Sequence, residues 1–133
     1  LDENLHMLFY RNTIAAALEL EPNAAMRAIT DVVTNFAMPG VDMPGFGRKA
    51  VGIALAGIYD LQQHLDDVIM PVLRAWKIFE RNDFSGDGLA ARDELAAFLS
   101  TIESQAKTFN DKREVYFEKQ IARGIEPIRI QTK

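Results

Sequence analysis

The sequence opens with Leu1-Asp2-Glu3-Asn4-Leu5-His6, and the helix formers that follow predict one helix over residues 1–20. Glu3 and His6 are three residues apart, so their side chains leave the same face of that helix on successive turns. A carboxylate and an imidazole at this spacing can both bind one metal ion. Tyr10 and Thr13 continue the same stripe. We therefore predict Glu3 and His6 as metal ligands and assign no catalytic or other cofactor-binding side chain.

A Glu-x-x-His pair that projects inward from a helix is half of what a ferritin-like di-iron bundle requires. The complete site takes a Glu from each of two helices and a Glu-x-x-His from each of two others. The sequence has one such pair, at its very start. We therefore expect the C-terminal part of a larger bundle, cut inside or just before a ligand helix. The alternative is that Glu3 and His6 lie in water at a frayed terminus.

The composition is ordinary for a globular domain with a hydrophobic core: 133 residues, 48% hydrophobic and 26% charged. The chain has no cysteine, which excludes disulfides and thiolate metal sites. No signal-peptide pattern is seen, and no apolar run reaches the roughly 18 residues of a membrane span. These features predict a cytoplasmic protein without a membrane span.

The charge is uneven along the chain, although the net charge is only −4. From Gln105 onward there are seven basic and four acidic residues, so this segment is +3 and the rest is −7. A mildly basic segment fits either an acidic partner or a solvated helix face. It is not basic enough to indicate nucleic-acid binding.

Apolar residues recur at helical spacing through the rest of the sequence, which predicts an all-α fold. Pro71 should kink or break its helix near Met70, and the apolar pattern thins after Asn110, where a second break is expected. His64 lies between polar residues and is expected at the surface. The predicted helices after the first span residues 22–37, 48–58, 59–79 and 89–121.

The end of the sequence changes character after Gly124, which is a suitable C-cap for the last helix. Residues 125–131 alternate apolar and polar side chains, so we expect an extended tail over 122–133 or an edge strand. We find no internal repeat and expect residues 1–133 to form a single helical region.

A second stretch with metal-binding character is Asp83-Phe84-Ser85-Gly86-Asp87-Gly88. Asp83, Ser85, Asp87 and Glu94 match positions 1, 3, 5 and 12 of an EF-hand calcium loop, and Gly88 matches position 6. Calcium binding by a single EF-hand-like module is therefore an alternative function. The competing interpretation is a turn whose polar side chains cap the next helix.

The sequence resembles the soluble acyl-acyl-carrier-protein desaturases of the mycobacterial type, in their C-terminal part. Asp2-Glu3-Asn4-Leu5-His6 with Tyr10 is similar to the family's second metal motif, Asp-Glu-x-x-His followed by Tyr. The order of further matches strengthens the likeness over nearly the whole chain. These matches are Met38-Pro39, Gly57-Ile58-Tyr59, Trp76-Lys77, and Ser85, Asp87-Gly88, Ala91 and Asp93.

The resemblance implies a di-iron centre in which Glu3 bridges the two irons and His6 is a terminal ligand of one. It implies oxygen-dependent introduction of a double bond into an acyl chain carried by acyl carrier protein, with electrons from ferredoxin. The family's other ligands would precede Leu1, so we expect the chain alone to be inactive. A non-catalytic helical interaction domain is a further alternative.

Helices that would pack on absent parts of such a bundle should expose apolar side chains. Leu5, Leu8, Phe9 and Val72 are the candidates, and Leu1 belongs to the same stripe. We therefore expect the chain to associate with itself as a homo-oligomer, either a dimer or a tetramer.

Overall fold

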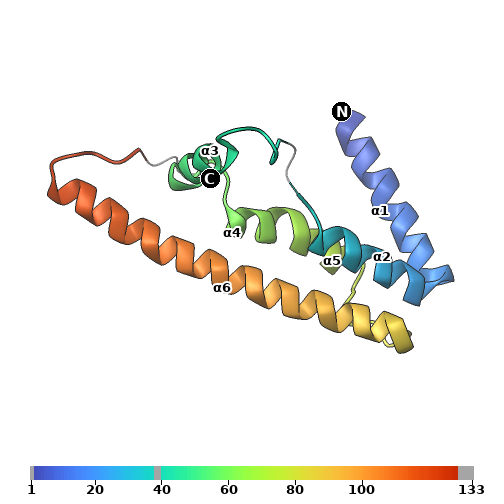
Figure 1. Ribbon diagram of the computed structural model, residues 1–133. Helices are drawn as coiled ribbons and strands as arrows, with labels where there is room; N and C mark the ends of the chain where they lie inside the picture. Colours follow the sequence, from blue (N-terminus) through green and yellow to red (C-terminus); the bar gives the residue numbers. More distant parts are fainter. Residues whose placement is uncertain (1, 38–39, 129–133) are drawn as a thin grey trace. The chain divides into compact units, whose positions relative to one another are not determined.

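The computed structural model describes residues 2–37 and 40–128, and in these residues it is built of helices joined by turns and loops (Figure 1). The predicted all-α class is confirmed. The helices are α1 (Asp2–Leu20), α2 (Pro22–Thr34), α3 (Phe46–Leu55), α4 (Leu61–Gln63), the π-helix η1 (His64–Ile69), α5 (Met70–Ala75) and α6 (Gly86–Ala122). Leu1 and the predicted Met38-Pro39 match lie outside the described residues.

The chain divides into two compact units, each with its own contacts. Unit 1 comprises residues 1–36 and 68–99, and unit 2 comprises residues 37–67 and 100–133. That the chain forms a single helical region stays a prediction.

Unit 1 is held together by a hydrophobic core that draws on four separate segments. Leu18 of α1 and Met26 of α2 are fully buried on either side of the sharp turn at Glu21. Pro22 begins α2, where its missing N–H costs nothing because a first-turn N–H has no partner within the helix. The other core members are Ile29, Ile69, Leu73, Ile78, Phe84, Ala91 and Leu95.

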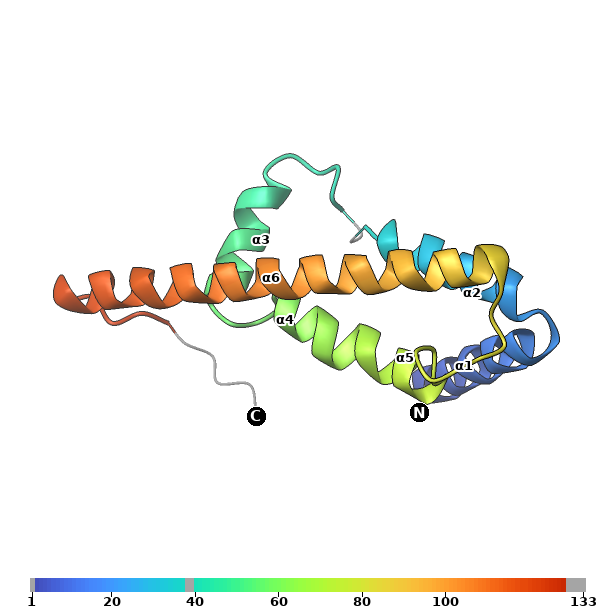
Figure 2. The ribbon, with the colours of Figure 1, turned by 90° about the horizontal axis from the view of Figure 1, so that it is seen from below.

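α2 lies along the first turns of α6, and both views show the two helices side by side (Figures 1 and 2). Thr30 of α2 is 1% exposed, and its hydroxyl donates a 2.8 Å hydrogen bond to the carbonyl of Ala91. The Asn23 side chain accepts from the Ser85 N–H at 2.8 Å and donates to the Ser85 hydroxyl at 3.1 Å. The helices approach closely at Gly88, where an added Cβ would lie 2.9 Å from the Asn23 Cα.

The expected helix over residues 59–79 is shorter and less regular than predicted. It begins after Asp60, whose carboxylate accepts from the Gln63 N–H at 2.9 Å in a capping box, and α5 ends at Ala75. Lys77 has a positive φ of 52°, and the Ile78 N–H bonds to the Leu73 carbonyl, as in a Schellman C-cap. Phe79, the last residue of the predicted helix, therefore lies outside the observed one and is 44% exposed.

Pro71 leads not to a break but to a change of helix type. The π-helix η1 ends at Ile69, immediately before α5, in which Pro71 occupies the first turn. In a regular α-helix the proline ring would meet the carbonyl four residues earlier, and the wider π-turn is one way to relieve that clash.

In unit 2, the second half of α6 is anchored by Arg113. Its guanidinium donates to the Asp60 carboxylate at 3.0 Å and to the Ala54 carbonyl at 3.2 Å, and the Asp60 side chain is only 7% exposed. α6 runs through Asn110 without interruption, so the expected break there was wrong. Gly124, with φ 76°, caps the helix as predicted. Residues 125–128 have no regular structure, and the remainder of the expected tail lies outside the described residues.

The second and third predicted helices differ from the structure at their ends. α2 stops at Thr34 rather than near residue 37, and α3 spans Phe46–Leu55 rather than residues 48–58.

Gly88→Ala should destabilise the protein, because the new methyl would collide with Asn23 on the neighbouring helix. We expect a loss of about 1–3 kcal/mol in the free energy of unfolding, typical of overpacking, despite the better helix propensity of Ala. Gly52→Ala is the control, since its Cβ would have no atom within 4 Å and should raise stability by up to about 1 kcal/mol. Urea unfolding followed by circular dichroism measures both. A gain in stability for Gly88→Ala similar to that for Gly52→Ala would contradict the close approach.

Candidate metal centre

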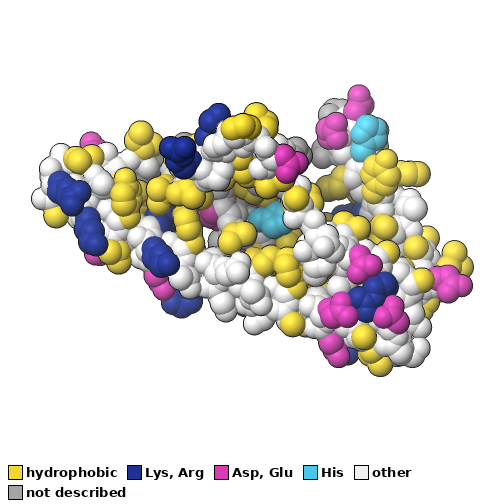
Figure 3. Space-filling view, viewed as in Figure 1, with side chains coloured by type: hydrophobic (Ala, Val, Ile, Leu, Met, Phe, Trp, Pro, Cys, Tyr) yellow, Lys and Arg dark blue, Asp and Glu magenta, His cyan; other side chains and the backbone are white. Residues whose placement is uncertain are grey.

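Glu3 and His6 lie together on the first turns of α1, as their spacing predicts. The His6 Nδ1 atom is 3.8 Å from the Glu3 Oε2 atom, and the side chains are 67% and 97% exposed. The space-filling view shows acidic and histidine side chains gathered at this end of α1 (Figure 3). A carboxylate and an imidazole therefore face outward from one helix. Both are available to a metal ion whose coordination other groups would have to complete.

The same stripe continues with residues that contribute no further ligand of the usual kind. Thr13 turns its hydroxyl back to the Phe9 carbonyl at 2.8 Å, and Tyr10 packs edge-on against Phe9 with its ring centroid 5.5 Å away. Over residues 2–37 and 40–128, no group of three or more His, Cys, Asp or Glu side chains is placed to hold a metal ion. Glu3 and His6 fit one half of a carboxylate-histidine site and do not form a complete one.

The first half of α1 also presents apolar side chains to water. Leu5, Leu8 and Phe9 are 60%, 38% and 65% exposed, as expected for a helix face without a partner, whereas Val72 is half-buried. α1 becomes buried only toward its end, at Leu18. The end of α1 that carries Glu3 and His6 is therefore poorly covered by the rest of unit 1.

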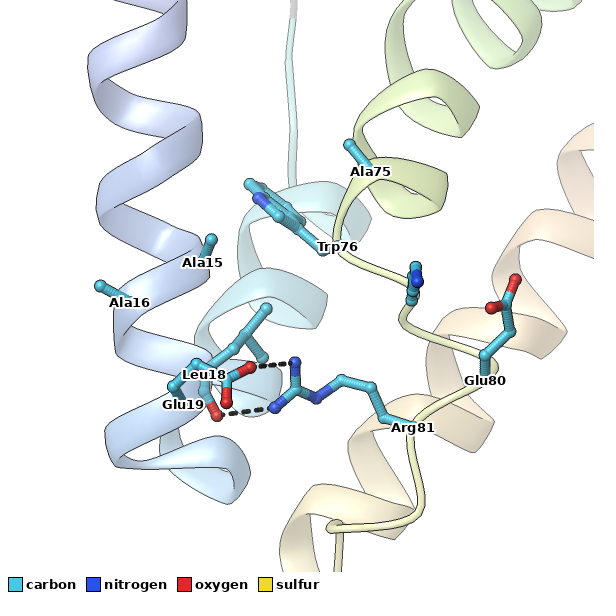
Figure 4. A pocket seen from close by; sticks show the side chains of 9 residues that line it. Ala15, Ala16, Leu18, Glu19, Ala75, Trp76, Glu80 and Arg81 are labelled. Carbon is cyan, nitrogen blue, oxygen red and sulfur yellow. Dashed lines mark hydrogen bonds and ion pairs between the residues drawn. The ribbon is translucent and has the colours of Figure 1, made fainter.

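The end of α1 is fixed by Arg81, which lies in an open pocket of about 580 Å³ (Figure 4). Its guanidinium donates to the Leu18 carbonyl at 3.1 Å and to the Glu19 carboxylate at 2.9 Å. Carbonyls in the last turn of a helix have no partner within the helix, and a cation there is favourable. Trp76 adds a second tie, because its indole N–H donates to the Arg11 carbonyl at 3.0 Å. These contacts orient α1, and two of the charged groups that line the pocket, Glu19 and Arg81, are paired with each other.

The expected calcium loop is not formed, because residues 86–94 belong to α6. Asp87 and Glu94 instead bind the guanidinium of Arg27 from α2. The Arg27 Nη2 atom is 2.7 Å from Asp87 Oδ1, and its Nη1 atom is 2.6 Å from Glu94 Oε2. Asp83 pairs with Arg81 at 2.7 Å. Arg27 and Arg81 thus provide the positive charge that calcium would supply to these acidic residues in the alternative interpretation.

The pKa values of these carboxyl groups reflect the same contacts. Hydrogen bonds from Arg27 hold the pKa of Asp87 and that of Glu94 below their ordinary values, and bonding to them raises the pKa of Arg27. Hydrogen bonding from Arg81 likewise lowers the pKa of Asp83. All three carboxylates are therefore stabilised in their charged form by arginines of the same unit.

His64, expected at the surface, is half-buried in unit 2, so that prediction was wrong. Its Nδ1 atom lies 2.7 Å from the Tyr59 hydroxyl, and burial lowers the pKa of the imidazole. Desolvation, followed by the charges of Asp60 and Asp67, raises the pKa of Tyr59. The polar residues near His64 in the sequence, Gln63 and Asp66, gave no sign of this pairing.

Comparison with known proteins bears on the family of the chain. The sequence profile of the fatty acid desaturases matches residues 1–125. The chain belongs to the fatty acid desaturase family. It is 49% identical over 122 residues to the protein named acyl-(acyl-carrier-protein) desaturase DesA1, a provisional name, in two strains of Mycobacterium tuberculosis, CDC 1551 / Oshkosh and H37Rv. The alignment covers 92% of the chain but only 35% of those relatives, so the chain spans about a third of their length. No solved structure matches significantly.

The structure gives a physical role to residues through which the chain resembles this desaturase family. Ser85 bonds to Asn23, Asp87 pairs with Arg27, and Gly88 admits the backbone of α2. Ala91 is fully buried, and its carbonyl accepts from Thr30. The stretch that imitates a calcium loop is therefore a docking surface for α2. Sequence analysis missed Arg27, because a single arginine on a helix gives no indication of distant acidic partners.

The Arg27 cluster should make the stability of the desaturase chain depend on pH. Because the folded-state pKa values of Asp87 and Glu94 are lowered, their stabilising effect is complete above the unfolded-state values of about 4 and is lost as pH falls through the folded values. Arg27→Gln should therefore unfold at lower urea than the native chain at pH 7, and this difference should narrow below about pH 4. High salt should narrow it as well, since the groups are exposed.

Lys107→Gln is the matched control, because it also removes one cation from an exposed pair, with Asp111 at 3.0 Å on α6. We expect this variant to change stability little at any pH. A difference between the native chain and Arg27→Gln that is constant from pH 7 to pH 3 would show that the ion pairs are not its source.

No helix in the described parts of the chain combines the length and apolarity needed to cross a membrane.

Proposed function

We propose that the chain supplies the Glu3 and His6 ligands of a di-iron centre in an acyl-acyl-carrier-protein desaturase. The observation that most directly supports this proposal is that both side chains lie on one face of α1, 3.8 Å apart, in a chain that belongs to the desaturase family. The name of the mycobacterial relatives supports acyl carrier protein as the substrate carrier. Carboxylate and imidazole ligands suit iron, and the pair fits the Glu-x-x-His half of such a site.

In this proposal the activity is the oxygen-dependent introduction of a double bond into a carrier-bound acyl chain, with electrons from ferredoxin, within a cytoplasmic protein. The iron pair, when bound, supplies the chemistry that activates oxygen for hydrogen removal. Glu3 would hold both irons and His6 one of them, while Arg81 and Trp76 keep the helix that carries them in place. The described residues provide two ligands, so the chain by itself is expected to be inactive.

Fe(II) binding tests this assignment directly. We expect the isolated chain to bind Fe(II) weakly under argon, and Glu3→Ala/His6→Ala to abolish the calorimetric signal. The matched control is Asp83→Ala/Glu94→Ala, which removes two acidic residues but should leave iron binding unchanged. Iron binding retained by Glu3→Ala/His6→Ala would refute the ligand assignment. Double-bond formation by the isolated chain with acyl carrier protein, ferredoxin and oxygen would refute the predicted inactivity.

We also propose that the exposed face of α1 associates with a second copy of the chain. Leu5, Leu8 and Phe9 leave a contiguous apolar surface that water does not favour. Light scattering should show a dimer or tetramer whose fraction rises with concentration, and Phe9→Glu should shift it toward the monomer. Val32→Glu, at a residue of similar exposure (69%) on α2, should have a smaller effect. A native chain that stays monomeric at high concentration would contradict this association.

A further inference from the structure

Unit 1 has an open pocket between the second half of α1 and the residues that follow α5 (Figure 4). We call it the α1–α5 pocket. Its volume of about 580 Å³ lies within the roughly 300–1,000 Å³ that is usual for small-molecule sites. Alanines on both sides leave space that larger side chains would fill, so the pocket has room for a compact apolar group. The apolar part of the lining consists of Ala15, Ala16, Leu18, Ala75 and Trp76.

Trp76 forms a fixed side of this pocket. Its indole N–H donates to the Arg11 carbonyl of α1 at 3.0 Å, and the side chain is half-buried. Figure 4 shows the indole ring directed across the pocket toward α1. Because the ring is already held in place, a ligand that packs against it would not have to order it, and this lowers the entropic cost of binding.

The two acidic residues of the lining leave the pocket suitable for an anion. The Glu19 carboxylate accepts from the Arg81 guanidinium at 2.9 Å, so its charge is compensated. The Glu80 side chain points away from Trp76 and from α1 (Figure 4). Neither carboxylate therefore presents an uncompensated negative charge to the space beside the indole ring.

Lys77 supplies a cation that the fold itself does not use. Its side chain lines the pocket and is exposed, and its ammonium forms no hydrogen bond or ion pair with the parts of the chain that the structure describes. Its φ of 52° is left-handed, a conformation for which glycine is usual at the end of a helix because it has no Cβ. Strained residues of this kind are frequent at functional sites. A helix cap alone would be satisfied by glycine, whereas an ammonium at this position requires lysine.

We propose that the α1–α5 pocket binds a small organic carboxylate with a compact apolar body. The apolar body would lie against Trp76 and the alanines, and the carboxylate would pair with the ammonium of Lys77. An apolar pocket with a single well-placed charged group is the usual form of a site that orients such a ligand. The inference goes beyond the proposed desaturase activity and uses neither Glu3 nor His6.

Trp76 is the single tryptophan of the chain, so intrinsic fluorescence reports directly on the pocket. The probe is cyclohexanecarboxylate, added to the full chain at constant ionic strength. Cyclohexylmethanol is the matched control, with the same apolar body and no charge, and inorganic phosphate is an anion without an apolar body. We expect cyclohexanecarboxylate to give a saturable change in the millimolar range, as its size allows. Cyclohexylmethanol should bind about threefold more weakly, and phosphate should give no saturable change.

Two pairs of variants locate the binding site. Lys77→Gln should weaken binding of cyclohexanecarboxylate about threefold and leave binding of cyclohexylmethanol unchanged, whereas Arg74→Gln, on α5 outside the pocket lining, should leave both unchanged. Ala15→Leu should fill the pocket and weaken both ligands at least about fivefold, while Ala28→Leu, at an exposed position of α2, should not. Circular dichroism verifies the fold of each variant.

Three outcomes would overturn the proposal. Equal binding of cyclohexanecarboxylate and cyclohexylmethanol would show that the pocket does not recognise a carboxylate, and equal weakening by Lys77→Gln and Arg74→Gln would show a nonspecific charge effect. The absence of any saturable change would show that the pocket is not a binding site. If Ala15→Leu does not fold, the comparison of the two glutamine variants still decides. None of these measurements depends on Fe(II), so failure of this proposal and failure of the desaturase assignment can be told apart.

Discussion

The packing of α2 against the start of α6 is the constraint on which unit 1 depends. At this contact an apolar interface, a buried hydroxyl and an arginine all act in the same place: Met26 and Ile29 are buried, Thr30 bonds to the Ala91 carbonyl, and Arg27 binds two carboxylates. The close approach is possible because Gly88 has no side chain. Once α2 is fixed in this way, the turn at Glu21 places the end of α1, and Arg81 holds it through the Leu18 carbonyl. The helix that carries Glu3 and His6 is thus oriented from its far end.

That arrangement explains why an acidic, glycine-containing stretch can imitate a calcium loop without being one. Calcium loops and helix-docking sites both place acidic side chains near a glycine, the first to surround an ion and the second to receive an arginine at close range. The sequence shows the acidic residues but not their partner, because Arg27 is 60 positions from Asp87. Local spacing therefore predicted the helices and the Glu3–His6 pair well. The distant partner of the acidic stretch required the tertiary structure.

The other differences between sequence and structure have local physical causes. Pro71 was expected to kink or break its helix near Met70, and at that point the structure changes from a π-helix to an α-helix, which leaves room for the ring. Asn110 was expected to interrupt α6, yet the helix continues because its neighbours on both sides pack, with Ala106 and Phe117 buried and Arg113 tied to Asp60. Apolar spacing shows which face of a helix is buried, but it does not show a hydrogen bond that holds a weak segment in place.

The two units differ in how they use charge. In unit 1 Arg27 and Arg81 form ion pairs with carboxylates, and Arg81 also donates to a carbonyl in the last turn of α1. Their charge therefore stabilises the fold. In unit 2 Arg113 is paired in the same way with Asp60, whereas Lys112, Lys119 and Arg123 are exposed along one stripe of α6.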